Sequence, residues 1–180
     1  MSEIEIKFKV ENFPTEKIEY LGFIKKKESH QVDFYQIVNK IIDGRRTYMR
    51  TRKDISKKEY SWDLHQIESE FSTNEIETSL TDEKSFVDTN TRLSIIGFPI
   101  VCEIDKQRTV FEKSNIKILL DSVKHLGKYV EIEIMGKDTQ ENRDILFNIA
   151  NELSLDNESR VSKKGYPDLF LEKYKNLTII

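Results

Sequence analysis

The sequence is poor in the residues that mark disulfide frameworks, flexible linkers and cysteine-based metal sites. Of its 180 residues, one is cysteine, three are proline and six are glycine. The single thiol, Cys102, excludes an internal disulfide and a multi-cysteine zinc site, and its apolar neighbours indicate a buried core residue. The three histidines, His30, His65 and His125, lie far apart without the spacing of metal ligands.

Long apolar runs and a basic excess are also missing. No stretch approaches the roughly 18 consecutive apolar residues of a membrane-spanning helix. Residues 1–5 are acidic and lack the basic head and apolar run of a signal peptide. The formal net charge is −3, whereas nucleic-acid surfaces are usually strongly basic. We therefore expect a cytoplasmic protein that binds neither membrane nor nucleic acid.

Period-two alternation of apolar and polar residues is the dominant pattern in the chain. Alternation of this kind predicts strands, and turn signals such as Asp43-Gly44 separate the runs. Short connections favour antiparallel hairpins, and no linker or repeat divides residues 1–180, so we expect one domain of seven or eight strands. The predicted strands are residues 3–10, 30–38, 47–53, 59–71, 100–111, 115–122 and 129–135.

Three segments have helical spacing instead. The first, residues 14–23, begins at Pro14, which suits a first helical position. The second starts near Thr81, where early acidic residues and a capping side chain precede apolar residues. The third, residues 139–153, carries one apolar stripe, so we expect it to pack on the outside of the sheet with Asp138 or Thr139 as its cap. Residues 162–174 predict an ordered turn and a short closing helix.

The polar faces of several strands consist of like-charged pairs. Side chains at positions i and i+2 point to the same side of a strand, about 7 Å apart, so each pair needs an external partner. One reading is a set of solvated faces on an open sheet, with acidic strands beside basic ones. The pairs are Glu3 and Glu5, Lys7 and Lys9, Arg50 and Arg52, Glu68 and Glu70, Lys106 and Arg108, and Glu131 and Glu133.

The recurrence of these pairs favours a closed barrel over an open sheet. Closure turns one face of every strand inward, and the apolar residues then pack against outer helices. We therefore predict an α+β fold: an eight-stranded antiparallel closed β-barrel with helices packed outside. A lumen so rich in charge must hold water, metal ions and a multiply charged ligand, because burying unpaired charges is costly.

A polyphosphate with divalent metal satisfies this requirement. Carboxylates are hard oxygen ligands for Mg²⁺ or Mn²⁺, and lysine and arginine bind phosphate oxygens by charge-assisted hydrogen bonds. The predicted metal ligands are Glu3, Glu5, Glu131, Glu133, Glu68 and Glu70. The predicted triphosphate-binding residues are Lys7, Lys9, Arg50, Arg52, Lys106 and Arg108.

The residues resemble the CYTH domain, or triphosphate tunnel metalloenzyme, superfamily. Its hallmark E-x-E-x-K strand is matched by Glu3-Ile4-Glu5-Ile6-Lys7, and later blocks follow in the same order over nearly the whole chain. The blocks around Lys106-Gln107-Arg108 and Leu126-Gly127 look most like class IV adenylate cyclases, which overlap thiamine triphosphatases. The resemblance implies an eight-stranded tunnel, with the glutamates near metal and the Lys and Arg residues near a triphosphate.

The sequence departs from this family at one position. Members usually carry a lysine on the strand after the R-x-R strand, and counting from Arg52 places Asp63 there. An inactive or altered-specificity member is one reading, and His65 or Lys58 could serve in place of the lysine. In triphosphatase relatives the lysine is associated with a tyrosine on the second strand, here Tyr35. We assign catalysis to Lys7 and Tyr35 as what the resemblance implies.

Three functions remain open from the sequence. The first is an adenylate cyclase-like conversion of ATP to cyclic AMP and pyrophosphate. The second is hydrolysis of thiamine triphosphate or inorganic tripolyphosphate, which needs the same metal and cations but a different attack geometry. The third is a non-catalytic polyphosphate-binding module, motivated by Asp63. A small-molecule triphosphate is the expected partner in each case, and a homodimer is compatible with all three.

Overall fold

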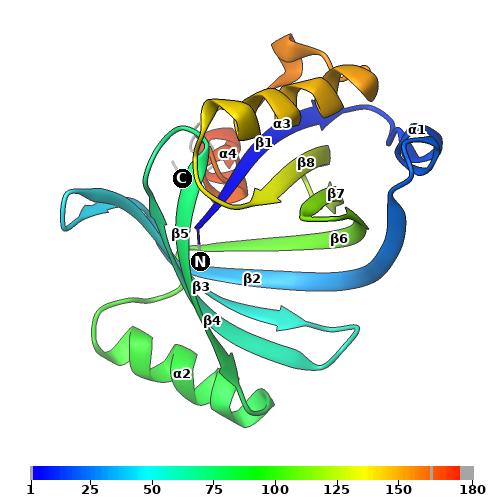
Figure 1. The fold of residues 1–180 in the computed structure, drawn as a ribbon. Coiled ribbons are helices and arrows are strands. Elements are labelled where there is room, and N and C mark those ends of the chain that lie inside the picture. The colour runs from blue at the N-terminus through cyan, green and yellow to red at the C-terminus, as the bar shows by residue number, and fades with distance from the viewer. Residues whose placement is uncertain (1, 163, 175–180) are drawn as a thin grey trace.

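The computed structural model describes residues 2–162 and 164–174, and its strands form a closed antiparallel barrel in the order β1-β5-β4-β3-β2-β6-β7-β8 (Figure 1). Strand β1 pairs with β8 on one side and with β5 on the other, which closes the ring. The predicted barrel with outer helices is confirmed. The strands are β1 Ser2–Val10, β2 Ile24–Ile42, β3 Arg45–Asp54, β4 Glu59–Ile67, β5 Ser72–Leu80, β6 Cys102–Lys113, β7 Ile116–Val123 and β8 Gly127–Met135.

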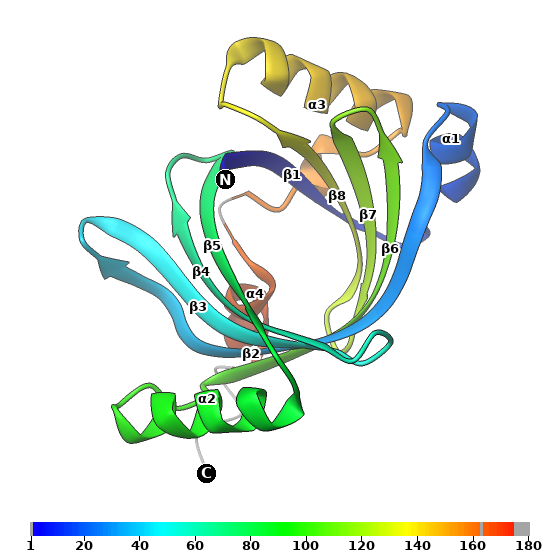
Figure 2. The ribbon, with the colours of Figure 1, turned by 60° about the horizontal axis from the view of Figure 1, so that its bottom comes forward.

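The helices lie around the barrel, with α3 and α2 on opposite sides of it (Figures 1 and 2). Among the described residues, no helix is long and apolar enough to cross a membrane. The predicted helices are all present, although α1 starts one residue after Pro14 and ends before Leu21. The helices are α1 Thr15–Tyr20, α2 Glu83–Ile95, α3 Gln140–Glu152 and α4 Tyr166–Tyr174, with a short 3₁₀ helix at Asn157–Ser159.

The apolar face of the strands points outward and packs under helices, as expected from the alternation. Ile4, Ile6 and Phe8 of β1 are almost completely buried in one cluster with residues of β7 and β8. Helix α3 covers this cluster with Leu146, and α1 contributes Ile18. The main apolar core therefore lies outside the barrel wall, and the inward faces of the strands are left for polar groups.

Helix α2 covers a second part of the wall. Its Phe86 contacts Phe34 of β2 edge-to-face and also packs near Tyr60 of β4. The helix is capped by Asp82, whose carboxylate accepts a 2.7 Å hydrogen bond from the Ser85 backbone N–H. Phe34 therefore packs between the barrel wall and α2.

One predicted strand is wrong in its extent. Residues 59–71 form β4 and a following turn, and a further strand, β5, begins at Ser72. The Glu68 and Glu70 pair therefore lies in the turn between β4 and β5, where period-two alternation does not apply. Strand β2 is also longer than predicted, and register shifts near Ile37 bend it along the barrel wall.

Candidate active site

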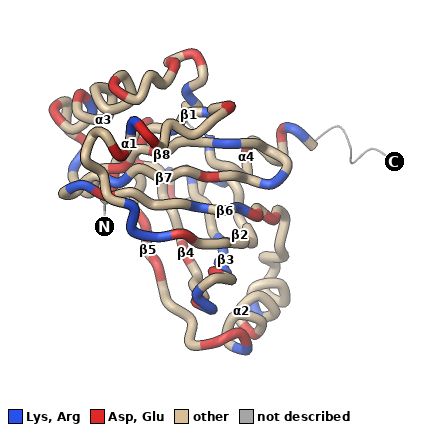
Figure 3. The backbone as a smooth tube through the Cα atoms, turned by 90° about the vertical axis from the view of Figure 1, so that its right-hand side faces the viewer, with Lys and Arg blue, Asp and Glu red and all other residues tan. Residues whose placement is uncertain are grey.

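The barrel encloses a charged cavity of about 290 Å³ to which all eight strands contribute side chains. A neighbouring cavity of about 570 Å³ shares five of its lining residues, so the two form one channel. Charged residues recur along the strands (Figure 3). The sequence-predicted residues that line the first cavity are Glu3, Glu5, Lys7, Tyr35, Arg50, Arg52, Glu70, Lys106, Arg108, Glu131 and Glu133.

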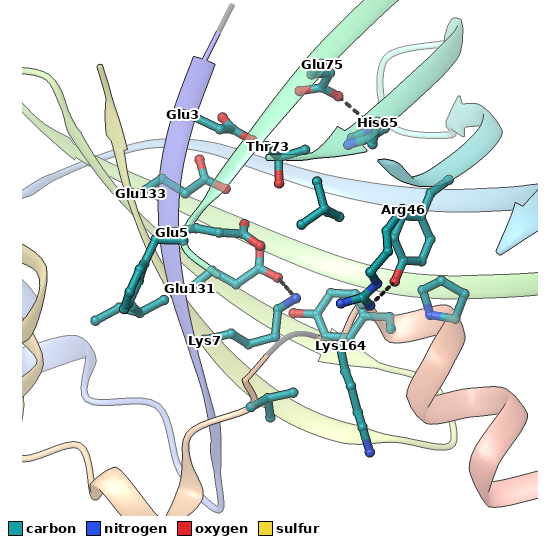
Figure 4. A pocket seen from close by; sticks show the side chains of 18 of the residues that line it. Glu3, Glu5, Lys7, Arg46, His65, Thr73, Glu75, Glu131, Glu133 and Lys164 are labelled. Atoms are coloured by element: carbon teal, nitrogen blue, oxygen red, sulfur yellow. Dashed lines mark hydrogen bonds and ion pairs between the residues drawn. The ribbon is translucent and has the colours of Figure 1, made fainter. Parts of the chain in front are cut away.

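Three carboxylates converge on one side of this cavity. Glu5 of β1 lies directly opposite Glu133 of β8 in the strand register, and one oxygen from each lies within 4.8 Å of the others and of Glu3. Figure 4 shows these side chains pointing into the same space. Burial and repulsion from Glu5 raise the pKa of Glu3 to about 7, and burial likewise raises the pKa values of Glu5 and Glu133.

This carboxylate cluster fits a divalent cation. Like charges directly opposite each other in a sheet are destabilising, and they become favourable only when a cation is shared between them. All three donors are hard oxygens, which suit Mg²⁺ or Mn²⁺ better than soft-ligand metals. Glu3, Glu5 and Glu133 are therefore the residues that would hold such an ion.

The fourth predicted glutamate, Glu131, has a different environment. Its carboxylate lies 3.0 Å from Lys7 Nζ and accepts a 2.7 Å hydrogen bond from Arg108. Burial would raise the Glu131 pKa, but Lys7 and Arg108 lower it below its ordinary value. Arg108 also binds Asp121 of β7, which accepts a 2.9 Å hydrogen bond from Tyr166. Glu131 thus orients two cations and remains ionised.

On another wall, Asp33 of β2 holds a group of cations. This aspartate has no solvent exposure, and its two oxygens accept hydrogen bonds from Arg52 at 2.5 and 3.0 Å. Lys106 of β6 donates to it at 3.1 Å, and Arg50 lies 3.5 Å away. Because β2 lies between β3 and β6 in the barrel, one carboxylate positions cations from both neighbouring strands.

Lys106 is the cation most affected by its surroundings. Its side chain is 2 % exposed and its ammonium lies 5.5 Å from the ring centre of Tyr166. Burial, together with repulsion from Arg108, lowers the Lys106 pKa to about 8 despite the contact with Asp33. Lys7 behaves oppositely: burial would lower its pKa, but Glu131 and Glu5 raise it above the ordinary value.

The side chains of Tyr35 and Asp63 both contact Arg50, so neither of them points into open space in the channel. The Tyr35 hydroxyl lies 3.4 Å from Arg50 Nη1, and burial raises the pKa of the phenol. A protonated phenol at neutral pH donates a hydrogen bond more readily than it removes a proton. Asp63 pairs with Arg50 across β3 and β4 and accepts a 2.8 Å hydrogen bond from its Nε.

Two predicted site residues do not line the channel. Lys9 is exposed and is not among the residues that line either cavity. Glu68 is exposed in the β4–β5 turn. Glu70 of the same turn lines the cavity, but its carboxylate is engaged by Arg160 at 2.9 Å and Ser162 at 2.7 Å, apart from the carboxylate cluster.

The channel also contains residues that sequence reasoning missed. Glu75 and Glu77 of β5 line it as an acidic i, i+2 pair, the same signal that identified the other strands. A strand predicted to run to Phe71 places residues 75–77 outside any predicted strand, so the pattern does not assign this pair to the channel. Arg46 of β3 also lines the cavity and bonds the Tyr48 hydroxyl at 2.9 Å. No signal in the sequence distinguishes Arg46 from its exposed neighbour Arg45.

Comparison with known proteins places this geometry in a family and a fold. The CYTH domain family model matches residues 1–164. None of the curated proteins compared with the chain matches it. Among solved structures, the PH1012 protein of Pyrococcus horikoshii is similar, with 24% identity and a TM-score of 0.80 over 93% of this chain and 98% of that one.

Two further solved structures share the fold at lower identity. A provisionally assigned adenylate cyclase from Vibrio parahaemolyticus has 17% identity and a TM-score of 0.75, over 93% of this chain and 97% of that one. The protein HpAC1 from Hippeastrum, described as having a dominant triphosphatase activity, has 12% identity and a TM-score of 0.63, over 97% and 95%. At these identities the similarity shows a common fold.

Proposed function

Because this chain belongs to the CYTH domain family, we propose that it is a metal-dependent enzyme acting on a nucleoside or organic triphosphate bound in the channel. The reaction we assign to it is the conversion of ATP to cyclic AMP and pyrophosphate. The observation that carries the proposal is the meeting, inside one closed barrel, of a carboxylate cluster that fits a cation and a wall of Lys and Arg that fits phosphate.

Each part of the channel has a distinct role in this proposal. A divalent ion held by Glu3, Glu5 and Glu133 would neutralise charge on the phosphate oxygens. Arg52 and Lys106, held in place by Asp33, would bind phosphate oxygens by charge-assisted hydrogen bonds. Phosphoryl chemistry depends mainly on such positioning and charge stabilisation, so few further groups are needed.

The size of the channel supports a substrate with an organic part. The neighbouring cavity of about 570 Å³ extends the space beyond the cation wall. A bare tripolyphosphate would leave this space to water. Cyclisation requires the ribose 3′-oxygen in line with the α-phosphorus, which a nucleoside held beyond the cations would allow.

Hydrolysis of thiamine triphosphate or inorganic tripolyphosphate is the second candidate. It uses the same carboxylates and cations, but it needs water in line with the terminal phosphorus. One specific observation favours it. HpAC1 is described as having a dominant triphosphatase activity, and this chain shares the fold of that protein. Under this reading the pathway of proton removal differs, while the residues that bind phosphate are unchanged.

A product-resolved screen tests these candidates. Purified protein is incubated with ATP, GTP, thiamine triphosphate or tripolyphosphate, with Mg²⁺ or Mn²⁺, and the products are separated. Cyclic AMP with pyrophosphate supports the cyclase, and orthophosphate supports the triphosphatase. Tight, metal-linked binding of a triphosphate without turnover would instead identify a non-catalytic binding module.

Substitution of Arg52 tests the phosphate-binding role directly. Loss of a charge-assisted hydrogen bond costs about 1.5–3 kcal/mol, so Arg52→Ala should weaken triphosphate binding roughly 10- to 100-fold. Lys53→Ala is the matched control, because Lys53 lies next in the chain but contacts Glu83 of α2 outside the barrel. Equal triphosphate affinities of the two variants would contradict the assignment of this wall.

A further inference from the structure

We propose that Asp63, His65 and Glu75 form a second metal site in the channel, selective for a divalent transition ion such as Mn²⁺ over Mg²⁺. Asp63 and His65 are at positions i and i+2 of β4, so their side chains share the inward face. Glu75 of β5 lies directly opposite His65 in the strand register. One donor atom from each of the three lies within 4.8 Å of the other two.

One buried oxygen of this cluster, on Asp63, lacks a hydrogen-bond partner among the described residues. Asp63 is 1 % exposed, and within the described residues its Oδ1 has no hydrogen-bond partner. His65 Nε2 lies 2.9 Å from Glu75 Oε1, a contact drawn in Figure 4, so the imidazole and this carboxylate lie side by side in the cluster. Buried polar atoms are normally satisfied, and a metal ion would satisfy Asp63 Oδ1.

Arg50 occupies only part of the cluster. Its Nε donates to Asp63 Oδ2 at 2.8 Å and its Nη2 lies 3.4 Å from Glu75 Oε1, which leaves Asp63 Oδ1 for a further ligand. Glu77 lies directly opposite Asp63 in the strand register, so three carboxylates lie near this one guanidinium. The cluster can therefore accept a further positive charge beside Arg50.

The donor types set the metal preference. One imidazole nitrogen with two carboxylates suits Mn²⁺, Co²⁺ or Zn²⁺, whereas Mg²⁺ prefers oxygen ligands alone. The carboxylate cluster of Glu3, Glu5 and Glu133 offers only oxygen. The two sites therefore differ in chemistry as well as in position, and an ion at Asp63 would supply positive charge where the family resemblance leads one to expect a lysine.

A competition titration tests the second site without relying on enzymatic activity. Mn²⁺ is titrated into protein in a large excess of Mg²⁺, and free Mn²⁺ is measured by its electron paramagnetic resonance signal. The wild-type chain should retain about one Mn²⁺, and His65→Phe should weaken that binding by about tenfold or more. Glu5→Gln should retain it, which separates this site from the proposed catalytic one.

His30→Phe is the matched control, because His30 also contacts one carboxylate, Asp105 at 2.8 Å, but belongs to no three-ligand cluster among the residues that the structure describes. Asp63→Asn provides a second variant if His65→Phe does not fold. Anomalous scattering from wild-type crystals grown with Mn²⁺ and Mg²⁺ should show a peak bounded by the three side chains. Retention of Mn²⁺ in both folded cluster variants, or an anomalous peak only at the carboxylate cluster, would overturn the proposal.

Discussion

Glu5 and Glu133 show how single side chains can link stability to metal binding. Their carboxylates lie opposite each other in the strand register, so the metal-free protein carries a repulsion that Lys7 and Arg108 offset only in part. Groups whose pKa is raised on folding favour the folded state at low pH, and this stabilisation is lost as the pH rises through the folded-state pKa. For Glu3, whose pKa is about 7, that loss falls in the physiological range.

We therefore predict that Glu5→Gln is more stable to heat than the wild type without metal, and less stable than the wild type when metal is bound. Without metal at pH 8, Glu5→Gln should unfold at a higher temperature than the wild type, because one buried charge is removed. At a hundredfold excess of metal over its Kd, the wild type should gain about 2.7 kcal/mol, or roughly 5–10 °C, and the variant should not. Calorimetry checks this, with the exposed Glu103→Gln as control.

Lys106 gives a second residue-scale prediction, on pH. Its pKa of about 8 means that the free protein loses this cation as the pH rises above 8, and triphosphate binding must then restore the proton. Below pH 7 Lys106 stays protonated, so its contribution to triphosphate affinity should not change with pH. Above pH 8 the affinity should fall by up to about tenfold per pH unit.

Calorimetric titrations between pH 7 and 9 measure this dependence. Lys106→Arg is the informative variant, because a guanidinium stays protonated throughout that range. Its triphosphate affinity should remain level above pH 8. An identical decline in both proteins would assign the pH dependence to another group.

At the scale of elements, the strands that the sequence predicted well are those with one apolar face. Strand β1 alternates Ile and Phe with Glu and Lys because its outer face lies under α3. Strand β5 lacks this pattern. Its inward face is polar because it lines the channel, and its outward Ile76 is 56 % exposed. Without a buried face, period-two alternation disappears from the sequence.

Helix α3 is expected to stabilise the barrel without contributing to chemistry. Leu146 has no solvent exposure and packs against the outer faces of β1 and β8. Leu146→Ala should lower the free energy of unfolding by about 2–5 kcal/mol while KM for the triphosphate stays unchanged. Denaturant titration measures the loss, and Ile95→Ala on α2, where the side chain is 79 % exposed, should change stability by no more than about 0.5 kcal/mol.

At the scale of the whole molecule, the arrangement of the site depends on which strands become neighbours. The charged pairs on β1, β3, β6 and β8 were evident from the sequence, since each is local to one strand. The role of Asp33 was not, because it follows from β2 lying between β3 and β6. The Asp63, His65 and Glu75 cluster likewise needs the pairing of β4 with β5. The pattern of residues along one strand does not show which strands pair or in what register, so these contacts could not be predicted from the sequence.

Neighbouring strands of the barrel do not all share the same number of paired residues. Strand β1 shares eight residue pairs with β8, from Glu3 to Val10, but only three with β5, from Ser2 to Ile4. Amide hydrogen exchange should therefore be faster along the β1–β5 junction than along β1–β8, measured by mass spectrometry on the intact chain. If β1 and β5 separate at this short junction, the barrel widens while α3 keeps β1 and β8 together. Bulky ligands can then enter and leave the channel while the other strands stay paired.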